Sequence, residues 1–225
     1  MSVGGETPEI SDVVPGMSLT EAMTTQRAIR RLTDEQVSDD LVRKLIGLAV
    51  KAPTAQNDQG WEFIVVRDPK VKARLAKVNR RTYKLAGPAV ARRHGHDETF
   101  MKVHRATQYQ ADHFEDIPVL VVCCMRNARV GWPPIIAASS YGSIMPAVQN
   151  LLLAARAAGL GATLTTMPLI SNWWARRILG LPWGITPVVV VPLGWPKGRY
   201  GPTTRRPVEE VVSIDTYGNR AWLDD

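Results

Sequence analysis

The sequence predicts a single α/β or α+β domain built around a β-sheet. Helical and strand-like patterns alternate along the 225 residues, and 45% of the residues are hydrophobic, which is enough for one well-formed core. We find no internal repeat and no linker that would divide the chain. Residues 1–17 carry acidic side chains among glycine and proline without periodicity, so we expect a flexible N-terminal arm followed by one domain over 18–225.

Two helices and a polar loop are expected in the first part of this domain. Ser18–Glu21 fits a capping box and starts a helix that should run toward Arg30. A second helix is expected over 38–51, where apolar residues recur at helical spacing. Pro53 ends that helix and opens a polar loop at 54–60.

A strongly basic stretch follows the first predicted strand, which covers 61–67. Asp68 and Pro69 provide an N-cap and a first-turn proline for a helix to about Val78. Between Arg67 and Arg105 there are twelve Lys/Arg and three Asp/Glu, with weak apolar periodicity. We therefore expect a mobile helical lid around 80–115.

The second half of the chain alternates buried strands and helices. Strands are predicted at 118–124, 162–166 and 187–194, where apolar residues form short runs. A long helix should cover 140–158, with Gly159 as its C-terminal stop and Pro146 marking either its start or a kink. A shorter helix is expected over 172–179. From about 196 onward three prolines indicate an extended C-terminal arm.

Composition narrows the class of protein and of partner. A net charge of +7 favours anionic ligands such as phosphates and nucleotides, and no basic–aromatic alternation indicates nucleic acid. The N-terminus does not resemble a signal peptide, and no apolar run is long enough to cross a bilayer. Cys123 and Cys124 are adjacent, so on a strand they face opposite sides and do not pair. We expect a soluble cytoplasmic protein.

The usual catalytic signatures are missing from the sequence. It contains no phosphate-binding P-loop, and Gly159-Leu160-Gly161 follows a helix instead of linking a strand to a helix. Four histidines between 94 and 113 lack acidic or cysteine partners at ligand spacing, so no metal site is expected. Ser139, Ser140 and Ser143 lack the context of a hydrolase nucleophile. An enzyme of this kind would depend on a cofactor.

Three separated segments have the chemistry to surround one flat, anionic ligand. In the predicted first helix, Arg27 and Arg30 share a face and are suited to grip a phosphate, although a solvated basic helix end has the same pattern. The stretch 52–63 is rich in amides, which match the edge of a heterocycle, although it also fits an ordinary loop. Near the C-terminus, a threonine-rich stretch at 163–166 precedes the Arg205-Arg206 pair.

These segments resemble the nitroreductase family of FMN-dependent flavoproteins. That family typically shows R-R-S-[IV]-R, then A-P-S-x-x-N-x-Q-P-W-x-F, a G-L-G before a threonine-rich turn, a G-[YW]-P, and a closing R-[KR]-P. Here the corresponding segments occur in the same order, within roughly residues 20–213. They are Gln26–Arg30, Ala52–Phe63, Gly159–Pro168, Gly194–Pro196 and Arg205–Pro207.

The resemblance implies an α+β nitroreductase-like sandwich, with a mostly antiparallel central sheet flanked by helices, assembled as an intertwined homodimer. The residues implied to bind FMN are Gln26, Arg27, Ala28, Ile29, Arg30, Thr54, Asn57, Gln59, Thr165, Thr166, Met167 and Arg205. Residues 26–30 and Arg205 would hold the phosphate and ribityl chain, and the other residues would lie against the ring. Gln26 and Ala28 replace the family's Arg and Ser, which reduces the number of phosphate donors, and Gly60 replaces a proline.

The implied activity is a two-step hydride transfer in which FMN does the bond-making, so no catalytic side chain is expected. A nicotinamide cofactor would reduce FMN, and a nitroaromatic or quinone-type acceptor would reoxidise it. The basic stretch favours NADPH over NADH, although it also fits a solvated lid. Alternatives are a dehalogenase or a flavin-cleaving enzyme of the same fold, or a non-catalytic flavin carrier. A dehalogenase would need an acidic, tyrosine and lysine set on the lid, and Tyr83-Lys84 lies apart from Glu98.

Overall fold

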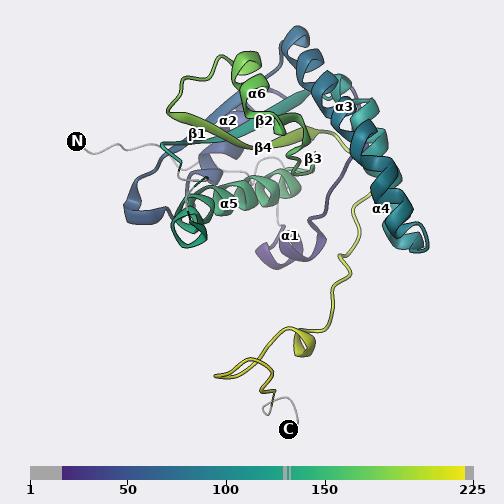
Figure 1. Cartoon of the computed structure of the whole chain (residues 1–225), viewed down its shortest axis with the longest axis vertical. Helices are drawn as coiled ribbons and strands as arrows, with labels where there is room; N and C mark the ends of the chain where they lie inside the picture. Colours follow the sequence, from purple (N-terminus) through teal and green to yellow (C-terminus); the bar gives the residue numbers. More distant parts are fainter. Residues whose placement is uncertain (1–16, 129–130, 132, 221–225) are drawn as a thin grey trace.

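The computed structural model describes residues 17–128, 131 and 133–220. Within them, an antiparallel sheet with the strand order β1-β2-β4-β3 lies between helical layers (Figure 1). The strands are β1 (Trp61–Val66), β2 (Val119–Arg126), β3 (Gly161–Ala162) and β4 (Ile185–Gly194). Each neighbouring pair runs antiparallel. The predicted α+β class, with an antiparallel sheet flanked by helices, is confirmed.

One face of the sheet packs against α2 (Asp39–Ala49) and α5 (Pro134–Ala157). Alternate residues of β2 point to this face because successive side chains on a strand point to opposite sides. Cys123 lies here beside Leu45 and Leu151, which are all inaccessible to solvent. The α5 helix is apolar on most of its surface because it lies between the sheet, α2 and α1.

The opposite face is covered by α3 (Pro69–His94) and α6 (Asn172–Leu179). Cys124 points to this second core, together with Leu75 and Phe114. Both cysteines are free thiols on opposite faces, as expected. The helix α4 (Glu98–Asp112) packs antiparallel to α3 at the side of the sheet (Figure 1). None of the described helices is long and apolar enough to span a membrane.

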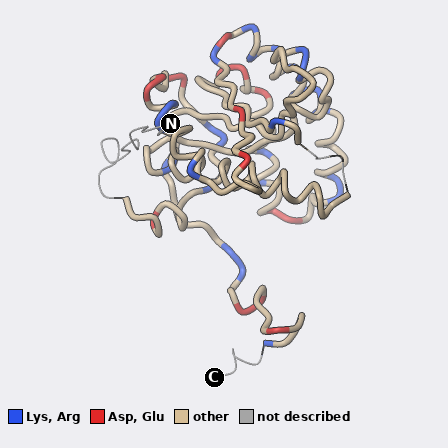
Figure 2. Tube along the Cα trace, turned by 90° about the vertical axis from the view of Figure 1, so that its left-hand side faces the viewer, with Lys and Arg blue, Asp and Glu red and all other residues tan. Residues whose placement is uncertain are grey.

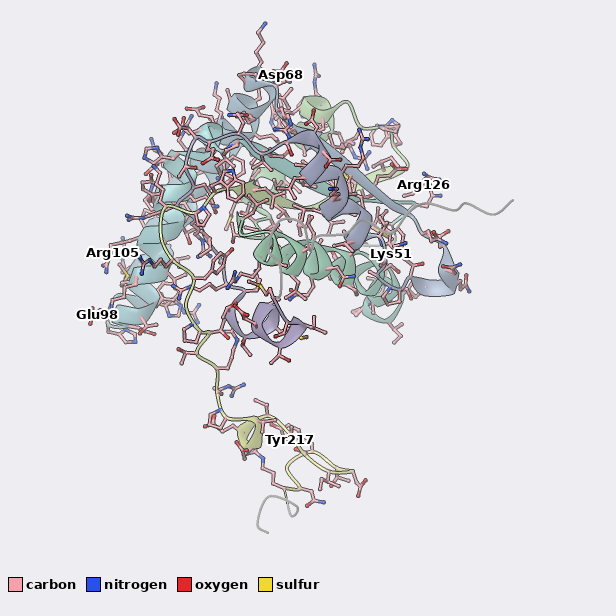
Figure 3. All side chains as sticks on the ribbon, turned by 180° about the vertical axis from the view of Figure 1, so that it is seen from behind. Lys51, Asp68, Glu98, Arg105, Arg126 and Tyr217 are labelled. Atoms are coloured by element: carbon pink, nitrogen blue, oxygen red, sulfur yellow. The ribbon has the colours of Figure 1, made fainter. Side chains whose placement is uncertain are left out.

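Short segments complete the chain. A small helix, α1 (Leu19–Thr25), lies against α5. Single 3₁₀ turns occur at Ala55–Asn57, Phe114–Asp116, Met167–Leu169 and Val208–Glu210. After β4 the chain runs along the body and then projects from it as an arm, which carries Tyr217 (Figures 1, 2 and 3). The predicted N-terminal arm falls almost wholly outside the described residues.

Several predicted boundaries are wrong. The first helix ends at Thr25 and not at Arg30. The helix after Asp68 continues to His94 instead of ending near Val78, even though Pro88 lies inside it. Likewise α5 begins at Pro134, so Pro146 sits within a helix and does not mark its start. The predicted strand 162–166 reduces to Gly161–Ala162 and an isolated bridge between Thr165 and Val190.

Candidate functional site

The segment 26–33 follows the edge of the sheet and is not helical. The Ile29 N–H donates to the Ala162 carbonyl at 3.0 Å, and the Thr33 N–H donates to the Trp195 carbonyl at 2.8 Å. These bonds to β3 and to the end of β4 replace the helical bonds that the sequence pattern favours. Arg27 and Arg30 therefore do not share a helix face, which corrects the prediction. The extended backbone instead turns their side chains to different sides.

Two glycines of the sequence motifs make room for this segment. Gly161 and Gly194 face each other across β3 and β4. A Cβ atom at Gly161 would lie 2.6 Å from a methyl carbon of Leu32, and one at Gly194 would lie 3.2 Å from the Leu32 Cβ. Both positions need glycine because the segment 26–33 crosses the sheet edge in close contact. Gly159 has a different role, since its φ of 77° ends α5 as predicted.

Arg30 is a half-buried cation without an acidic partner among the described residues. It lines a cavity of about 430 Å³ together with Tyr109, His113 and Lys197. The carboxylates of Asp34 and Asp116 also line this cavity, but neither forms an ion pair with Arg30 among the described contacts. Burial lowers the pKa of Arg30, and the nearby Tyr83 hydroxyl acts in the opposite direction. A guanidinium that has lost water without gaining a carboxylate is a ready site for an anion. Arg27 is exposed and lies next to Gly201 of the C-terminal segment.

The loop at 54–60 forms a second, separate polar site. Gln59 binds the other two predicted residues: its N–H donates to Thr54 Oγ1 and its side-chain amide donates to Asn57 Oδ1, both at 3.1 Å. Gln56, Asn57 and Gln59 have φ values of 55°, 55° and 49°, in the left-handed region that costs most residues energy. The loop lines a cavity of about 450 Å³ beside the first turns of α5. Backbone strain held in place by hydrogen bonds is typical of functional loops.

Ser143 anchors that loop, which sequence reasoning missed. Its hydroxyl accepts the Ala55 N–H at 3.0 Å and donates to the Ser139 carbonyl at 2.7 Å. The Trp61 indole N–H donates to the Ser143 carbonyl at 2.9 Å. The sequence draws attention to Ser143 only as a hydroxyl without the context of a nucleophile. Its role depends on the hydrogen bond to Ala55, which lies 88 residues away in sequence. No local signal in the sequence indicates that contact.

The turn at 165–167 follows β3 and pairs with β4, the two strands whose edge the segment 26–33 contacts. Thr165 exchanges two backbone hydrogen bonds with Val190, at 2.8 and 2.9 Å, while Thr166 is exposed. Met167 begins a 3₁₀ turn that packs against α3. The exposed Arg205 follows Thr203, whose N–H donates to the Thr24 carbonyl at 2.9 Å, so it stands where the arm leaves α1.

The predicted residues thus fall into two groups at opposite ends of α5. Ser143, which holds the loop, is separated along this helix from Arg156, which binds Thr25 at the start of the other group. Thirteen residues at 1.5 Å each put these anchors roughly 20 Å apart. One chain therefore gathers 26–30 with 165–167 but keeps 54–59 away from them. Figure 3 shows the loop's end of the molecule, marked by Lys51 and Arg126, far from the α3–α4 pair.

Comparison with known proteins assigns the chain to a family. The nitroreductase family profile matches residues 23–195, which include both groups except Arg205. The chain belongs to the nitroreductase family. Among nitroreductase relatives, a protein of Methanothermobacter thermautotrophicus, provisionally named NADH dehydrogenase/NAD(P)H nitroreductase, is 29% identical and the match covers 84% of this chain and 83% of the relative. The resemblance inferred from the five motifs is confirmed.

Other similar proteins have a different named activity. Human iodotyrosine deiodinase 1 is 24% identical, with 91% of this chain and 71% of the relative covered. A solved iodotyrosine deiodinase, bound to FMN and 3-iodo-L-tyrosine, shares the fold with a TM-score of 0.72 at 23% identity, covering 89% of this chain and all of that one. The NfrA1 nitroreductase of Bacillus subtilis gives a TM-score of 0.69 at 19% identity, covering 89% and 75%.

A buried tyrosine network joins α3 and α4, and within the described residues no cluster could hold a metal ion. The Tyr83 hydroxyl lies 2.8 Å from Nδ1 of His104 and 2.9 Å from its carbonyl oxygen. Glu98 stands at the far tip of the α3–α4 pair, where it binds Lys102 (Figure 3). The structure therefore does not bring Tyr83 and Glu98 together around one ligand.

Proposed function

We propose that this chain is an FMN-dependent NAD(P)H oxidoreductase that reduces nitroaromatic or quinone-type acceptors. The observation that carries the proposal is Arg30, a half-buried cation without a described acidic partner, which shares a cavity with Lys197 in a nitroreductase-family fold. Its surroundings suit a phosphate or another anionic part of a flavin nucleotide. The names of the relatives, which include nitroreductases and a Thermus thermophilus NADH dehydrogenase, support an oxidoreductase.

The donor set fits FMN in chemistry. Arg27, Arg30 and Arg205 supply positive charge, and Gln26 with the backbone of Ala28 would supply neutral donors for the phosphate and ribityl chain. Ile29, whose N–H already binds the Ala162 carbonyl, would lie beside them. On the other side, Thr54, Asn57 and Gln59 supply the amide and hydroxyl groups that match a pyrimidine edge. Thr165, Thr166 and Met167 would lie against the ring.

The two groups fit one FMN only if two chains cooperate. Because α5 holds them roughly 20 Å apart in one chain, we propose a homodimer in which the loop 54–60 of one chain completes the site of the other. Exposed Ile135, Tyr141 and Met145 on α5 supply an apolar surface for this contact. The arm from about 196 would wrap the partner, and α3 with α4 would form the lid over the site.

When bound, FMN would accept a hydride from the nicotinamide cofactor and pass electrons to the acceptor. The chain's own task is then to bind and orient. Arg30 fixes the anionic end, the strained loop holds amides in place before the ligand arrives, and the lid limits access of water. We assign no side chain to proton transfer, and we place the reaction in the cytoplasm.

The basic helix α3 supports NADPH as the preferred co-substrate. It carries lysines and arginines along its length and no acidic residue. The extra phosphate of NADPH would be attracted to this surface, and salt would weaken the attraction. We expect the ratio of kcat/KM for NADPH over NADH to exceed one at low salt and to fall at high salt. A ratio near one in both buffers would reject the preference.

The purified protein tests the main proposal directly. We expect a yellow flavin spectrum, or binding of added FMN that quenches its fluorescence, and bleaching when NADPH is mixed in anaerobically. Adding a quinone should then restore the yellow colour. A flavin that binds but is not bleached by either nicotinamide would indicate a carrier. A colourless protein that binds no FMN would overturn the proposal.

A deiodinase is the second candidate because of the deiodinase relatives. The structure gives it less support, since Tyr83 is buried against His104 and Glu98 lies at the tip of the lid. Iodide release from 3-iodo-L-tyrosine by the reduced protein, at a rate above that of quinone reduction, would favour this candidate over the first.

A further inference from the structure

A third cavity, of about 420 Å³, lies between α3 and α6 and has an apolar floor with a basic rim. Its apolar walls are Val78, Leu85, Ile170, Trp174 and Ile178, and its hydroxyls are Thr82 and Ser171. Its charged residues are Arg74, Lys77 and Arg81, and no acidic residue lines it. None of these residues belongs to the segment 26–33 or the loop 54–60.

The spacing on α3 separates the two kinds of residue. Residues 74, 77 and 81 follow each other at i, i+3 and i+7, which places them along one stripe of the helix. Residues 78, 82 and 85 have similar spacing and form the adjacent stripe, which faces the cavity. On the other wall, Trp174 and Ile178 are four residues apart on α6 and turn the same way. The cavity thus has apolar walls on both sides and positive charge on one.

The rim cations have no ion pairs with any residue of the described chain. By contrast Arg80, their neighbour on α3, points away from the cavity and binds Glu115 through both guanidinium nitrogens. Arg74, Lys77 and Arg81 are exposed, and so are three of the five apolar wall residues: Leu85 is 79% exposed, Ile170 67% and Trp174 50%. Large apolar side chains left in water beside unpaired cations are typical of a ligand-binding surface.

We propose that this cavity binds a small amphipathic anion, with an aromatic or short acyl body and a carboxylate, sulfonate or phosphate head. The volume lies in the range of small-molecule sites. The apolar body would cover Leu85, Ile170 and Trp174, and the head would meet the rim of Arg74, Lys77 and Arg81. Charge complementarity favours an anion over a neutral apolar molecule, because nothing acidic in the cavity offsets the three cations. The proposal does not depend on the proposed redox activity.

A pair of fluorescent probes tests both halves of this proposal. 8-Anilinonaphthalene-1-sulfonate is an aromatic anion, and N-phenyl-1-naphthylamine has the same body without the sulfonate. On the FMN-loaded full chain, we expect one sulfonate probe to bind per chain, about tenfold tighter than the neutral probe at low salt. The K77E/R81E variant should weaken the anion about tenfold and leave the neutral probe nearly unchanged. The I170D variant should weaken both probes.

The matched control is R92E/R93E, which makes the same charge change on α3 outside the cavity. It should bind both probes as the unsubstituted chain does. All three variants change exposed residues, and circular dichroism verifies their folding; if K77E/R81E fails to fold, K77Q/R81Q replaces it.

Three results would overturn the proposal. The first is equal weakening of the sulfonate probe by K77E/R81E and by the control, which would mean that general charge attracts it. The second is sedimentation of the protein with phosphatidylserine vesicles that K77E/R81E abolishes, without one-to-one probe binding, which would make the surface a membrane contact. The third is a change of oligomeric mass in I170D, which would assign the surface to contact between copies of the chain.

Discussion

The two ends of α5 carry two polar sites of opposite character. At one end the loop 54–60 is neutral, rich in amides, and held by Ser143 and Gln59 in a backbone conformation that few residues adopt freely. At the other end the segment 26–33 has ordinary backbone bonds to the sheet edge, but presents the half-buried charge of Arg30. The energetic cost at the first end comes from backbone conformation, and the cost at the second end comes from the desolvation of Arg30.

This difference indicates that the polar sites at the two ends of α5 depend on a ligand in different ways. The loop satisfies its own hydrogen bonds and keeps its shape, so a ligand gains from a surface that is already ordered. The cationic end has a desolvated charge that only an anion can satisfy. We therefore expect a change of the loop backbone to alter stability, and removal of the Arg30 charge to alter affinity for the ligand more than stability. Four experiments test whether the two sites differ in this way, in order of decreasing expected effect.

The first experiment removes the support that both ends share. Leu151 is fully buried on α5 between the two anchors, and L151A should lower the free energy of unfolding by about 3 kcal/mol because it leaves a cavity. Urea denaturation measures the loss. The control is Q149A on the same helix, where the side chain is exposed and the change should stay within about 0.5 kcal/mol. Equal effects would contradict the role of α5 as the common support.

The second experiment tests the cationic end. R30A should weaken FMN binding about tenfold to a hundredfold, since a charge-assisted hydrogen bond contributes about 1.5–3 kcal/mol. The same change should not destabilise the cofactor-free protein, because Arg30 is desolvated without a described acidic partner. Fluorescence quenching of FMN measures the affinity. R31A, which removes an exposed guanidinium from the Tyr109 ring, serves as the control. An R30A variant with unchanged affinity for FMN would contradict the assignment of Arg30 to an anion site.

The third experiment uses pH at the same end. Tyr200 donates to the Leu160 carbonyl at 2.5 Å beneath Arg156, and burial raises its pKa to about 12 despite that cation. In the unfolded chain the hydroxyl ionises near pH 10, so the stability that it contributes is complete below pH 10 and is lost between pH 10 and 12. Y200F should cost about 1 kcal/mol at pH 8.

The stability gap between Y200F and the unsubstituted chain should therefore shrink as the pH rises from 10 to 12. Urea titrations at pH 8, 10 and 11.5 measure the gap. A gap that stays constant would show that Tyr200 ionises alike in the folded and unfolded states, and would remove this link between pH and the cationic end.

The fourth experiment relaxes the loop. Gln56 has a φ of 55°, which glycine adopts without steric cost, so Q56G should raise the free energy of unfolding by roughly 0.5 kcal/mol after the entropy of glycine is subtracted. E35G, at an exposed loop position outside the left-handed region, should lower stability instead. Thermal unfolding of both variants gives the comparison. Two losses of similar size would show that the loop is not strained.

Much of the fold follows from local sequence signals. The helix 172–179 matches α6 at both ends, and Ser38, Asp68 and Gly159 mark helix ends as their chemistry requires. Alternation on β2 correctly places Cys123 and Cys124 on opposite faces. These elements are predictable because the decisive interactions lie within a few residues along the chain.

The failures have one physical cause, which is tertiary contact overriding local preference. The pattern before Arg30 is helical, yet Ile29 and Leu32 are drawn to the glycine-lined edge of β3 and β4. The sequence motifs pointed to residues 26–30 and 54–59 but gave no sign that α5 keeps them apart. Ser143 and the cavity between α3 and α6 were missed because each depends on neighbours distant in sequence. The assignments to FMN of all twelve residues remain predictions.

The neighbouring thiols on β2 have a practical consequence. Cys123 reports on the core under α2 and α5, and Cys124 reports on the core under α3 and α6. Burial raises the pKa of Cys124 to about 12, so this thiol resists alkylation until the chain opens locally. In single-cysteine variants, the rate of alkylation by iodoacetamide would measure the opening of each layer separately. Two residues that are adjacent in sequence thereby report independently on the opening of the two cores.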